Sequence, residues 1–466
     1  MKKEQIIALC ISLQRLNAKD LLMAIIHERN FFSWKDFQDD ARNLGDLERF
    51  KLVIETLPDQ KLIHTLSILR GNGRNDHPIK AMWNSILAGI VFEHASIESL
   101  RRELSRNAQL REMCGFDPIL GVKSVPSKSA YNRFLSKLVA HEPLVREMFD
   151  CLVKELITLI PDFGTNLAGD GKAIHSFGKP SKKENGDKRH EEEADWGVKK
   201  YCGIDEGGKA WEKVKSWFGF RIHLLIDADA ELPISYAVTK ASVGEQPVMR
   251  ELFAELKNVH PELIERCDHA MFDKGYDSKE SICDLWKKYG IKPIIDIRNM
   301  WKDGEKTKQL KSKKVQNVTY DFKGTVFCHC PKTGEVRQMA YAGFEEKRET
   351  LKYNCPALAY GIECKGASEC PVYQKSIRIP LHEDQRIFTP VARSSYKWKA
   401  LYDKRSSVER VNSRIDVSFG FERHYIRGLQ KMKLRCGLAL SVMLAIAVGR
   451  LRQEHPELMR SLVQAA

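Results

Sequence analysis

The sequence lacks a secretory signal and an apolar run long enough to span a bilayer. Its first apolar stretch is interrupted by Gln14, Arg15 and Lys19, which excludes the continuous apolar core of a signal peptide. One late apolar run, residues 436–448, is too short to cross a membrane and predicts a buried helix. We therefore expect no membrane partner.

The sequence also has few closely spaced cysteine pairs, and fewer acidic residues than basic ones. The twelve cysteines are mostly scattered, which favours a reducing cytosol over a disulfide scaffold. The chain has 76 Lys+Arg against 62 Asp+Glu, a formal net charge of +14. This balance favours nucleic acid or another anionic surface as the partner. Charge alone does not decide, because many basic proteins bind neither.

The length of 466 residues allows roughly two or three domains with a large core. A content of 43% hydrophobic and 30% charged residues is ordinary for a soluble globular protein. Changes in periodicity along the chain predict four segments. Their boundaries are 1–160, 161–297, 298–394 and 395–466.

The first segment is predicted to be helical. Residues 100–110 have helical spacing with interleaved arginines, and a second helix is expected to begin after Ser127 as its N-cap. Arg133 and Lys137 would lie near one side of that helix. Two interpretations are equally compatible with this pattern: a helix-turn-helix reader of DNA, or a helical bundle with basic surface residues.

The second segment predicts an α/β domain with a mixed five-stranded sheet flanked by helices. Antiparallel strands joined by a hairpin come first, and strands linked by helices follow. A charged segment, residues 179–193, is expected to be a mobile loop. The expected strands are 166–170, 217–226, 232–238, 270–273 and 291–297, and the expected helices are 246–256 and 278–289.

Residues 298–394 interrupt this pattern and are predicted to be an insertion. They are rich in lysine at first and then contain five cysteines. Four thiolates could hold a structural Zn²⁺ ion tetrahedrally, but the spacing is not that of a standard pair of Cys-x2-Cys motifs. Reduced, metal-free thiols are the alternative. The cysteines are Cys328, Cys330, Cys355, Cys364 and Cys370.

Three carboxylates stand where a metal-dependent phosphoryl-transfer site would need them. Asp170 and Asp273 each end a predicted strand, the edge at which open α/β sheets carry their sites. Glu409 lies in a predicted helix. Two divalent cations held by such a set can activate a water and stabilise a leaving oxygen at phosphorus. Taken singly, each aspartate is better explained by a structural role, in a turn or a helix cap, than by a catalytic one.

The helix around Glu409 is amphipathic. Val408, Val411 and Ile415 are expected to pack on the sheet. The other face contains Tyr402, Arg405, Glu409, Asn412 and Asp416. Arg405, Arg410 and Arg414 would keep the glutamate ionised, unless the helix is simply a surface helix with ion pairs.

The segment 396–435 is basic, with eleven Lys/Arg and four Asp/Glu. Its cations are expected to contact DNA phosphates. Its aromatic residues could stack on unpaired bases, but we expect Phe419 and Phe421 to belong to the core.

Three short motifs in this order resemble the DDE transposases of bacterial insertion sequences, and more narrowly the branch with the YREK signature. Residues 100–138 also resemble the leader region of such transposases. The motifs are Ala168-Gly169-Asp170-Gly171-Lys172, Met271-Phe272-Asp273-Lys274-Gly275-Tyr276-Asp277 and Tyr402-x2-Arg405-x3-Glu409.

The resemblance implies an RNase H-like domain in which Asp170, Asp273 and Glu409 bind two Mg²⁺ or Mn²⁺ ions. It implies cleavage at transposon ends and strand transfer into target DNA by a 3′-hydroxyl. It also implies recognition of terminal inverted repeats, a homodimer in a synaptic complex, and a bacterial, cytoplasmic and nucleoid-associated location. The residues expected to contact DNA are Tyr402, Arg405, Arg410, Arg414 and Lys431.

One position departs from the signature, because its lysine is replaced by Asp416, which cannot hold a phosphate. Two other functions use the same features. One is a nuclease or resolvase without strand transfer, and the other is a DNA-binding protein derived from a transposase that has lost the chemistry. The presence of all three carboxylates argues against the second.

Overall fold

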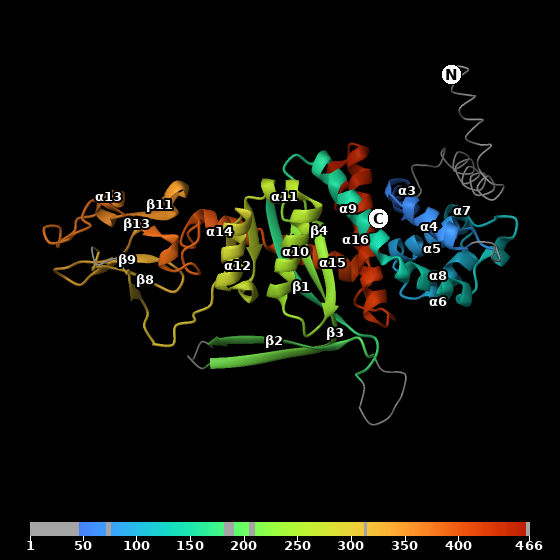
Figure 1. Ribbon diagram of the computed structural model, residues 1–466, viewed down its shortest axis with the longest axis horizontal. Coiled ribbons are helices and arrows are strands. Elements are labelled where there is room, and N and C mark those ends of the chain that lie inside the picture. Colours follow the sequence, from blue (N-terminus) through green and yellow to red (C-terminus); the bar gives the residue numbers. More distant parts are fainter. Residues whose placement is uncertain (1–45, 71–75, 181–190, 205–209, 312–314, 463–466) are drawn as a thin grey trace, which may run out of the picture. The chain divides into compact units, whose positions relative to one another are not determined.

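The computed structural model describes residues 46–70, 76–180, 191–204, 210–311 and 315–462 (Figure 1). The expected mobile loop, 179–193, lies mostly outside these residues. The chain divides into two compact units, each formed by separate stretches of sequence. Unit 1 contains residues 1–159, 174–194 and 413–466, and unit 2 contains residues 160–173 and 195–412.

Unit 1 is helical, as expected for the N-terminal segment. Its helices are α3 (Asp46–Thr56), α4 (Gln60–Arg70), α5 (Ile79–Val91), α6 (Ile97–Arg106), α7 (Ala108–Cys114), α8 (Lys128–Ala140), α9 (Glu142–Leu159) and α16 (Leu429–Arg452). Ser127 caps α8 by accepting a hydrogen bond from the Ala130 N–H, which confirms the predicted helix start.

The late apolar run forms the centre of α16, which packs against α3, α5 and α9. The helix has 24 residues, so it extends beyond the predicted apolar run at both ends. By length and composition α16 could cross a membrane, but 83% of its most apolar window is buried inside the protein. Core helices pass the same test, and the prediction of a buried helix is confirmed.

Unit 2 is built on a mixed sheet, which confirms the α/β prediction. In the described part of the chain this sheet has six strands, in the order β2-β3-β1-β5-β6, with β4 also paired to β3. β5 is parallel to both β1 and β6, whereas β2 and β4 are antiparallel to β3. The strands are β1 (Asn166–His175), β2 (Asp195–Ile204), β3 (Ala210–Asp227), β4 (Leu232–Lys240), β5 (His269–Phe272) and β6 (Lys292–Ile295).

Two details of the predicted sheet were wrong. The strand expected to end at Asp170 continues to His175, because residues 171–175 remain extended and Ile174 is buried. β2 was not among the predicted strands. It pairs along its whole length with the first half of β3, and both strands extend beyond the rest of the sheet in Figure 1.

Helices in unit 2 cover the sheet, and one of them carries Glu409, the third candidate carboxylate. α10 (Glu245–Val259) packs on β3 and β4, and α14 (Tyr396–Asp403) packs on β5 and β6. The helix expected at 278–289 is divided into α12 (Lys279–Cys283) and a π-helical turn, Asp284–Lys288. The remaining helices are α11 (Pro261–Arg266) and α15 (Ser406–Ser418), and α15 crosses the boundary between the units.

The insertion folds into two small antiparallel sheets with a core of their own. The first has the order β10-β9-β8-β7, and the second has the order β11-β12-β13. Val318, Leu351 and Phe388 are among the buried residues of this core. The strands are β7 (Lys308–Gln309), β8 (Val318–Tyr320), β9 (Val326–His329), β10 (Val336–Gln338), β11 (Ala340–Glu345), β12 (Thr350–Asn354) and β13 (Ser376–Pro380), and the short helix α13 is Pro356–Tyr360.

Candidate active site

Strand pairing places two of the three candidate carboxylates side by side. β1 and β5 are parallel, with Ala168 opposite Met271, an offset of 103 residues. Asp170 lies two residues beyond Ala168, and Asp273 lies two residues beyond Met271, directly after β5, so continuing this register brings the two aspartates level with each other. Parallel neighbours are about 4.8 Å apart and residues at one level point to the same face, so the two side chains leave the sheet together.

Each aspartate is held by its local backbone. Asp273 directly follows β5, and its Oδ1 accepts a hydrogen bond from the Gly275 N–H at 2.7 Å. On β1, a side chain at Gly169 would place its Cβ 2.4 Å from Phe272 Cε1. Glycine therefore lets Phe272 pack on one side of β1, while Asp170 points to the other side.

The two carboxylates affect one another electrostatically. Burial raises the pKa of Asp170; the positive charge of Lys199 opposes this rise and the negative charge of Asp273 adds to it. Arg405 also acts to lower the pKa of Asp170. The pair therefore has a concentration of negative charge that nearby cations partly compensate.

α15 approaches this pair through Asn412, whose Nδ2 donates to Asp170 Oδ2 at 3.3 Å. Glu409, one helical turn earlier, does not join the aspartates. Its Oε1 accepts a 2.7 Å hydrogen bond from Arg405, and its side chain is 56% exposed. Among the described residues, no three Asp, Glu, His or Cys side chains form a group that could hold a metal ion. The expected convergence is thus found for the aspartates but not for the glutamate carboxylate.

The predicted DNA-contacting residues have different environments. Tyr402 stacks on Trp398, with 4.7 Å between ring centroids, and the guanidinium of Arg405 lies 5.8 Å from the Tyr402 ring. Arg410 instead forms an ion pair with Glu231 at 2.6 Å. Arg414 and Lys431 belong to unit 1.

The predicted core of this region is confirmed. Val408, Val411 and Ile415 are buried, as expected for the apolar face of α15, and so are Phe419 and Phe421.

A second group of charged residues beside the aspartates was not predicted. Glu245, the first residue of α10, forms ion pairs with Lys199 at 3.3 Å and Arg221 at 3.2 Å. The next residue, Gln246, donates from Nε2 to the Gly275 carbonyl at 2.7 Å. The sequence offered a weak signal, a glutamate at a helix start after glycine, which is equally typical of helix capping.

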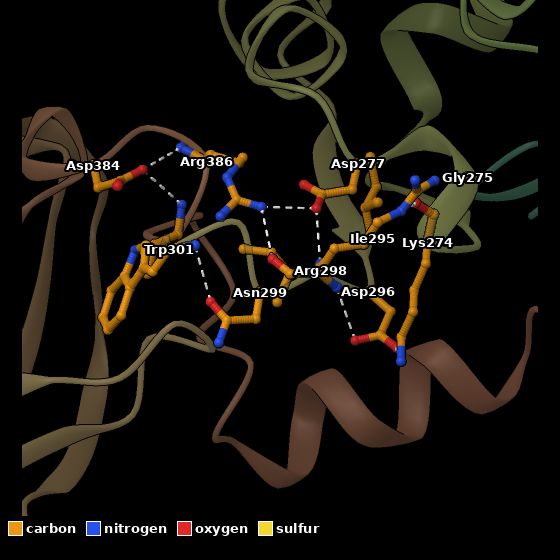
Figure 2. Close-up of polar contacts among 12 residues, drawn as sticks. Lys274, Gly275, Asp277, Ile295, Asp296, Arg298, Asn299, Trp301, Asp384 and Arg386 are labelled. Atoms are coloured by element: carbon orange, nitrogen blue, oxygen red, sulfur yellow. Dashed lines mark hydrogen bonds and ion pairs between the residues drawn. The ribbon is translucent and has the colours of Figure 1, made fainter. Parts of the chain in front are cut away.

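The turn after Asp273 is also tied to the insertion, as Figure 2 shows. Asp277 is fully buried, and its Oδ2 accepts hydrogen bonds from Arg386 Nη1 and from the Arg298 N–H, both at 2.8 Å. Arg298 Nε donates to the Lys274 carbonyl at 2.8 Å. At the far end of the insertion, Arg393 Nε donates to the Ile295 carbonyl of β6 at 3.0 Å.

The five cysteines of the insertion line one small cavity of about 20 Å³. Hydrogen bonding by Thr333 lowers the pKa of Cys330 to about 7, and Cys330 also interacts with Cys364. Burial and the neighbouring cysteines raise the pKa of Cys328 to about 11. The fold therefore gathers the predicted thiols, although they do not surround a common point in the way a metal ion requires.

Comparison with known proteins now gives the family. The family described as "Transposase DDE domain" matches residues 188–444, more than half of the chain. The chain belongs to the DDE transposase family. The match includes Asp273, Glu409 and the whole insertion, whereas Asp170 precedes it.

A cryo-EM structure of the piggyBac transposase synaptic complex with hairpin DNA is similar at 13% sequence identity and a TM-score of 0.36. The alignment covers 90% of this chain and 79% of that chain. No curated protein matches the sequence significantly. Membership of the DDE family makes this protein an enzyme that acts on DNA.

Proposed function

We propose that this protein is a DNA transposase that cleaves transposon ends and joins them to target DNA, using Asp170, Asp273 and Glu409. The observation that carries this proposal is that Asp170 on β1 and Asp273, directly after the parallel strand β5, interact electrostatically, while Asn412 of the helix that bears Glu409 donates to Asp170. The formal charge of +14 suits a polyanionic substrate.

The residues at this site fit Mg²⁺ or Mn²⁺. Their donors are carboxylate oxygens, the ligands that these hard cations prefer, and two of them already lie together. Asn412 adds a neutral oxygen: its Oδ1 is buried, and no donor among the described residues reaches it. Two bound cations would supply Lewis-acid activation of a water or 3′-hydroxyl and stabilise the leaving oxygen.

We expect Glu409 to reach the two aspartates by giving up its ion pair with Arg405. Its carboxylate is exposed and paired with Arg405, four residues earlier on the same face. When DNA binds, a phosphate can take the Arg405 guanidinium, which forms strong bidentate bonds with phosphate oxygens. Glu409 is then free to turn toward Asp170, which already contacts Asn412 on the next turn of α15. Arg405 and Tyr402 would thus contact the DNA backbone near the cut.

The strand order supports an RNase H-like catalytic domain. Antiparallel β3 and β4 lie on one side of β1, and parallel β5 and β6 lie on the other. β2 is an addition to that arrangement. By the same resemblance, we propose that a homodimer pairs two terminal repeats, in a bacterial cytoplasm, and that Arg410, Arg414 and Lys431 are secondary DNA contacts.

The decisive experiment uses labelled duplexes that carry the repeats flanking the gene, incubated with the full chain, Mg²⁺ or Mn²⁺ and a supercoiled target plasmid. We expect nicked ends and covalent joining of the label to the plasmid, both dependent on the metal. Cut DNA without joined product would support the nuclease alternative. Binding without cutting would support the DNA-binding alternative.

We also propose that the insertion cysteines, which line one cavity, hold a structural Zn²⁺ ion once the thiols are deprotonated and their side chains turn toward one another. Purified protein is expected to contain about one zinc per chain, the stoichiometry of a four-thiolate site. Cys364→Ser should lower that content and the thermal stability of the insertion, whereas Cys151→Ser, at an exposed cysteine of α9, should change neither. Absence of zinc, together with free reactivity of these thiols, would support the alternative of reduced cysteines.

A further inference from the structure

The strongest unassigned feature lies directly beside the aspartates. Glu245 is a fourth carboxylate, and it occupies the space into which a side chain at Gly171 or Gly275 would project. A Cβ added at Gly171 would lie 2.7 Å from Glu245 Oε1, and one at Gly275 would lie 3.2 Å from Glu245 Oε2. Glu245 is therefore positioned between the two segments that carry Asp170 and Asp273.

Two cations accompany Glu245. Arg221 on β3 is 7% exposed, and its guanidinium also donates to the Val243 carbonyl at 3.2 Å and lies 5.0 Å from the Trp217 ring. Several contacts thus fix the position of Arg221. Lys199 on β2 is 32% exposed and pairs with Glu245 through a longer, flexible side chain.

Lys199 is held at the edge of the aspartate pair. Its Nζ donates to the carbonyl of Gly171, the residue after Asp170, at 3.2 Å. It also stands opposite Lys215 in the β2–β3 ladder, an arrangement of like charges that costs stability unless an anion is close. Glu245 supplies that anion, so the position of Lys199 is determined by a carboxylate and a backbone carbonyl next to the site.

We infer that Lys199 is a resident countercation of the site, which compensates Asp170 and Asp273 before divalent metal ions bind, and that Glu245 is the positioning residue that holds it there. The inference rests on the proposed metal-dependent function. It follows from charge and distance: a cation beside two carboxylates stabilises them while they are metal-free and repels an incoming divalent ion. Glu245 offsets that repulsion because it keeps a negative charge beside Lys199 and beside the segments that carry the two aspartates.

The test is binding of Mn²⁺ to the full-length protein, measured by calorimetry without DNA. Removing the charge with Lys199→Met is expected to tighten Mn²⁺ binding about tenfold, because a cation near the ligands is lost. Glu245→Gln is expected to weaken binding by a similar factor, and the double variant should bind nearly as the wild type does. A merely structural role would weaken binding in every variant.

Lys200→Met is the matched control. Lys200 is the next residue on β2, it is 64% exposed, and it pairs with Glu212 at 3.2 Å on the other face of the strand. It should leave Mn²⁺ affinity unchanged. Unfolding curves of each metal-free variant show whether it is folded, and Lys199→Met should lower the metal-free stability.

The outcomes separate the two proposals. If the wild type shows no saturable Mn²⁺ binding that Asp170→Asn removes, the proposed metal site fails. If such binding exists but Lys199→Met leaves it unchanged or weakens it, the site stands and the countercation inference is overturned.

Discussion

Replacing Asp170 with Asn is expected to lower the rate of metal-dependent DNA cleavage by at least about a thousandfold, because metal ions supply several kcal/mol of transition-state stabilisation. The substitution keeps the shape of the side chain and its contact with Asn412, but removes the charge that would bind the cation. DNA binding should persist, since it depends on the basic residues elsewhere. Cleavage of end duplexes and a gel-shift assay of the same variant measure the two effects separately.

Asp229→Asn is the matched control for this experiment. Asp229 lies in the turn between β3 and β4, half exposed, where it forms an ion pair with Lys404 at 2.6 Å. Surface pairs of this kind contribute about 0–1 kcal/mol, so cleavage should be unchanged. Cleavage by Asp170→Asn at the wild-type rate would refute the assignment of the site.

Replacing Arg386 with Met is expected to destabilise unit 2 by about 3–5 kcal/mol, the usual effect of removing one partner from a buried ion pair. Asp277 has no exposed side-chain surface, and Arg386 is 13% exposed. The variant would remove the ion pair and leave Asp277 with the hydrogen bond from the Arg298 N–H and the more distant charge of Arg393, which would loosen the turn that carries Asp273. Urea unfolding and hydrogen exchange of residues 273–277 measure the two effects.

Arg378→Met in β13 provides the comparison. Arg378 pairs with Glu345 at 2.8 Å, but the side chains are 42% and 30% exposed, so a loss of less than about 1 kcal/mol is expected. The double variant Arg386→Met/Asp277→Asn removes the buried charge as well and should recover part of the lost stability. Equal effects of Arg386→Met and Arg378→Met would show that the buried pair does not stabilise the fold.

The sequence predicted correctly those features that depend on the residues of a single strand, hairpin or helix. The strand before Asp273, the hairpin of β3 and β4, the buried face of α15 and the N-cap at Ser127 each follow from local periodicity or capping, and each is found. The convergence of Asp170 and Asp273 was predicted because the ends of neighbouring strands meet at one edge.

Contacts between side chains that are far apart in the sequence could not be predicted from local patterns. No pattern in the sequence shows that Lys199 and Glu245, 46 residues apart, are 3.3 Å from each other. The pairing of Glu409 with Arg405 rather than with the aspartates is also a choice among rotamers, which helical spacing leaves open. β2 was missed because strands that extend beyond a core lack alternating apolar residues.

The anchoring of the insertion at both ends has an evolutionary consequence. Arg298 binds the turn after Asp273, and Arg393 binds the carbonyl of Ile295 in β6, so the polypeptide leaves the sheet after β6 and returns beside β6 before α14 begins. The segment between these anchors can lengthen, shorten or be exchanged without displacing the helix that follows. Related chains should therefore diverge most in this module while retaining the two arginines at its borders.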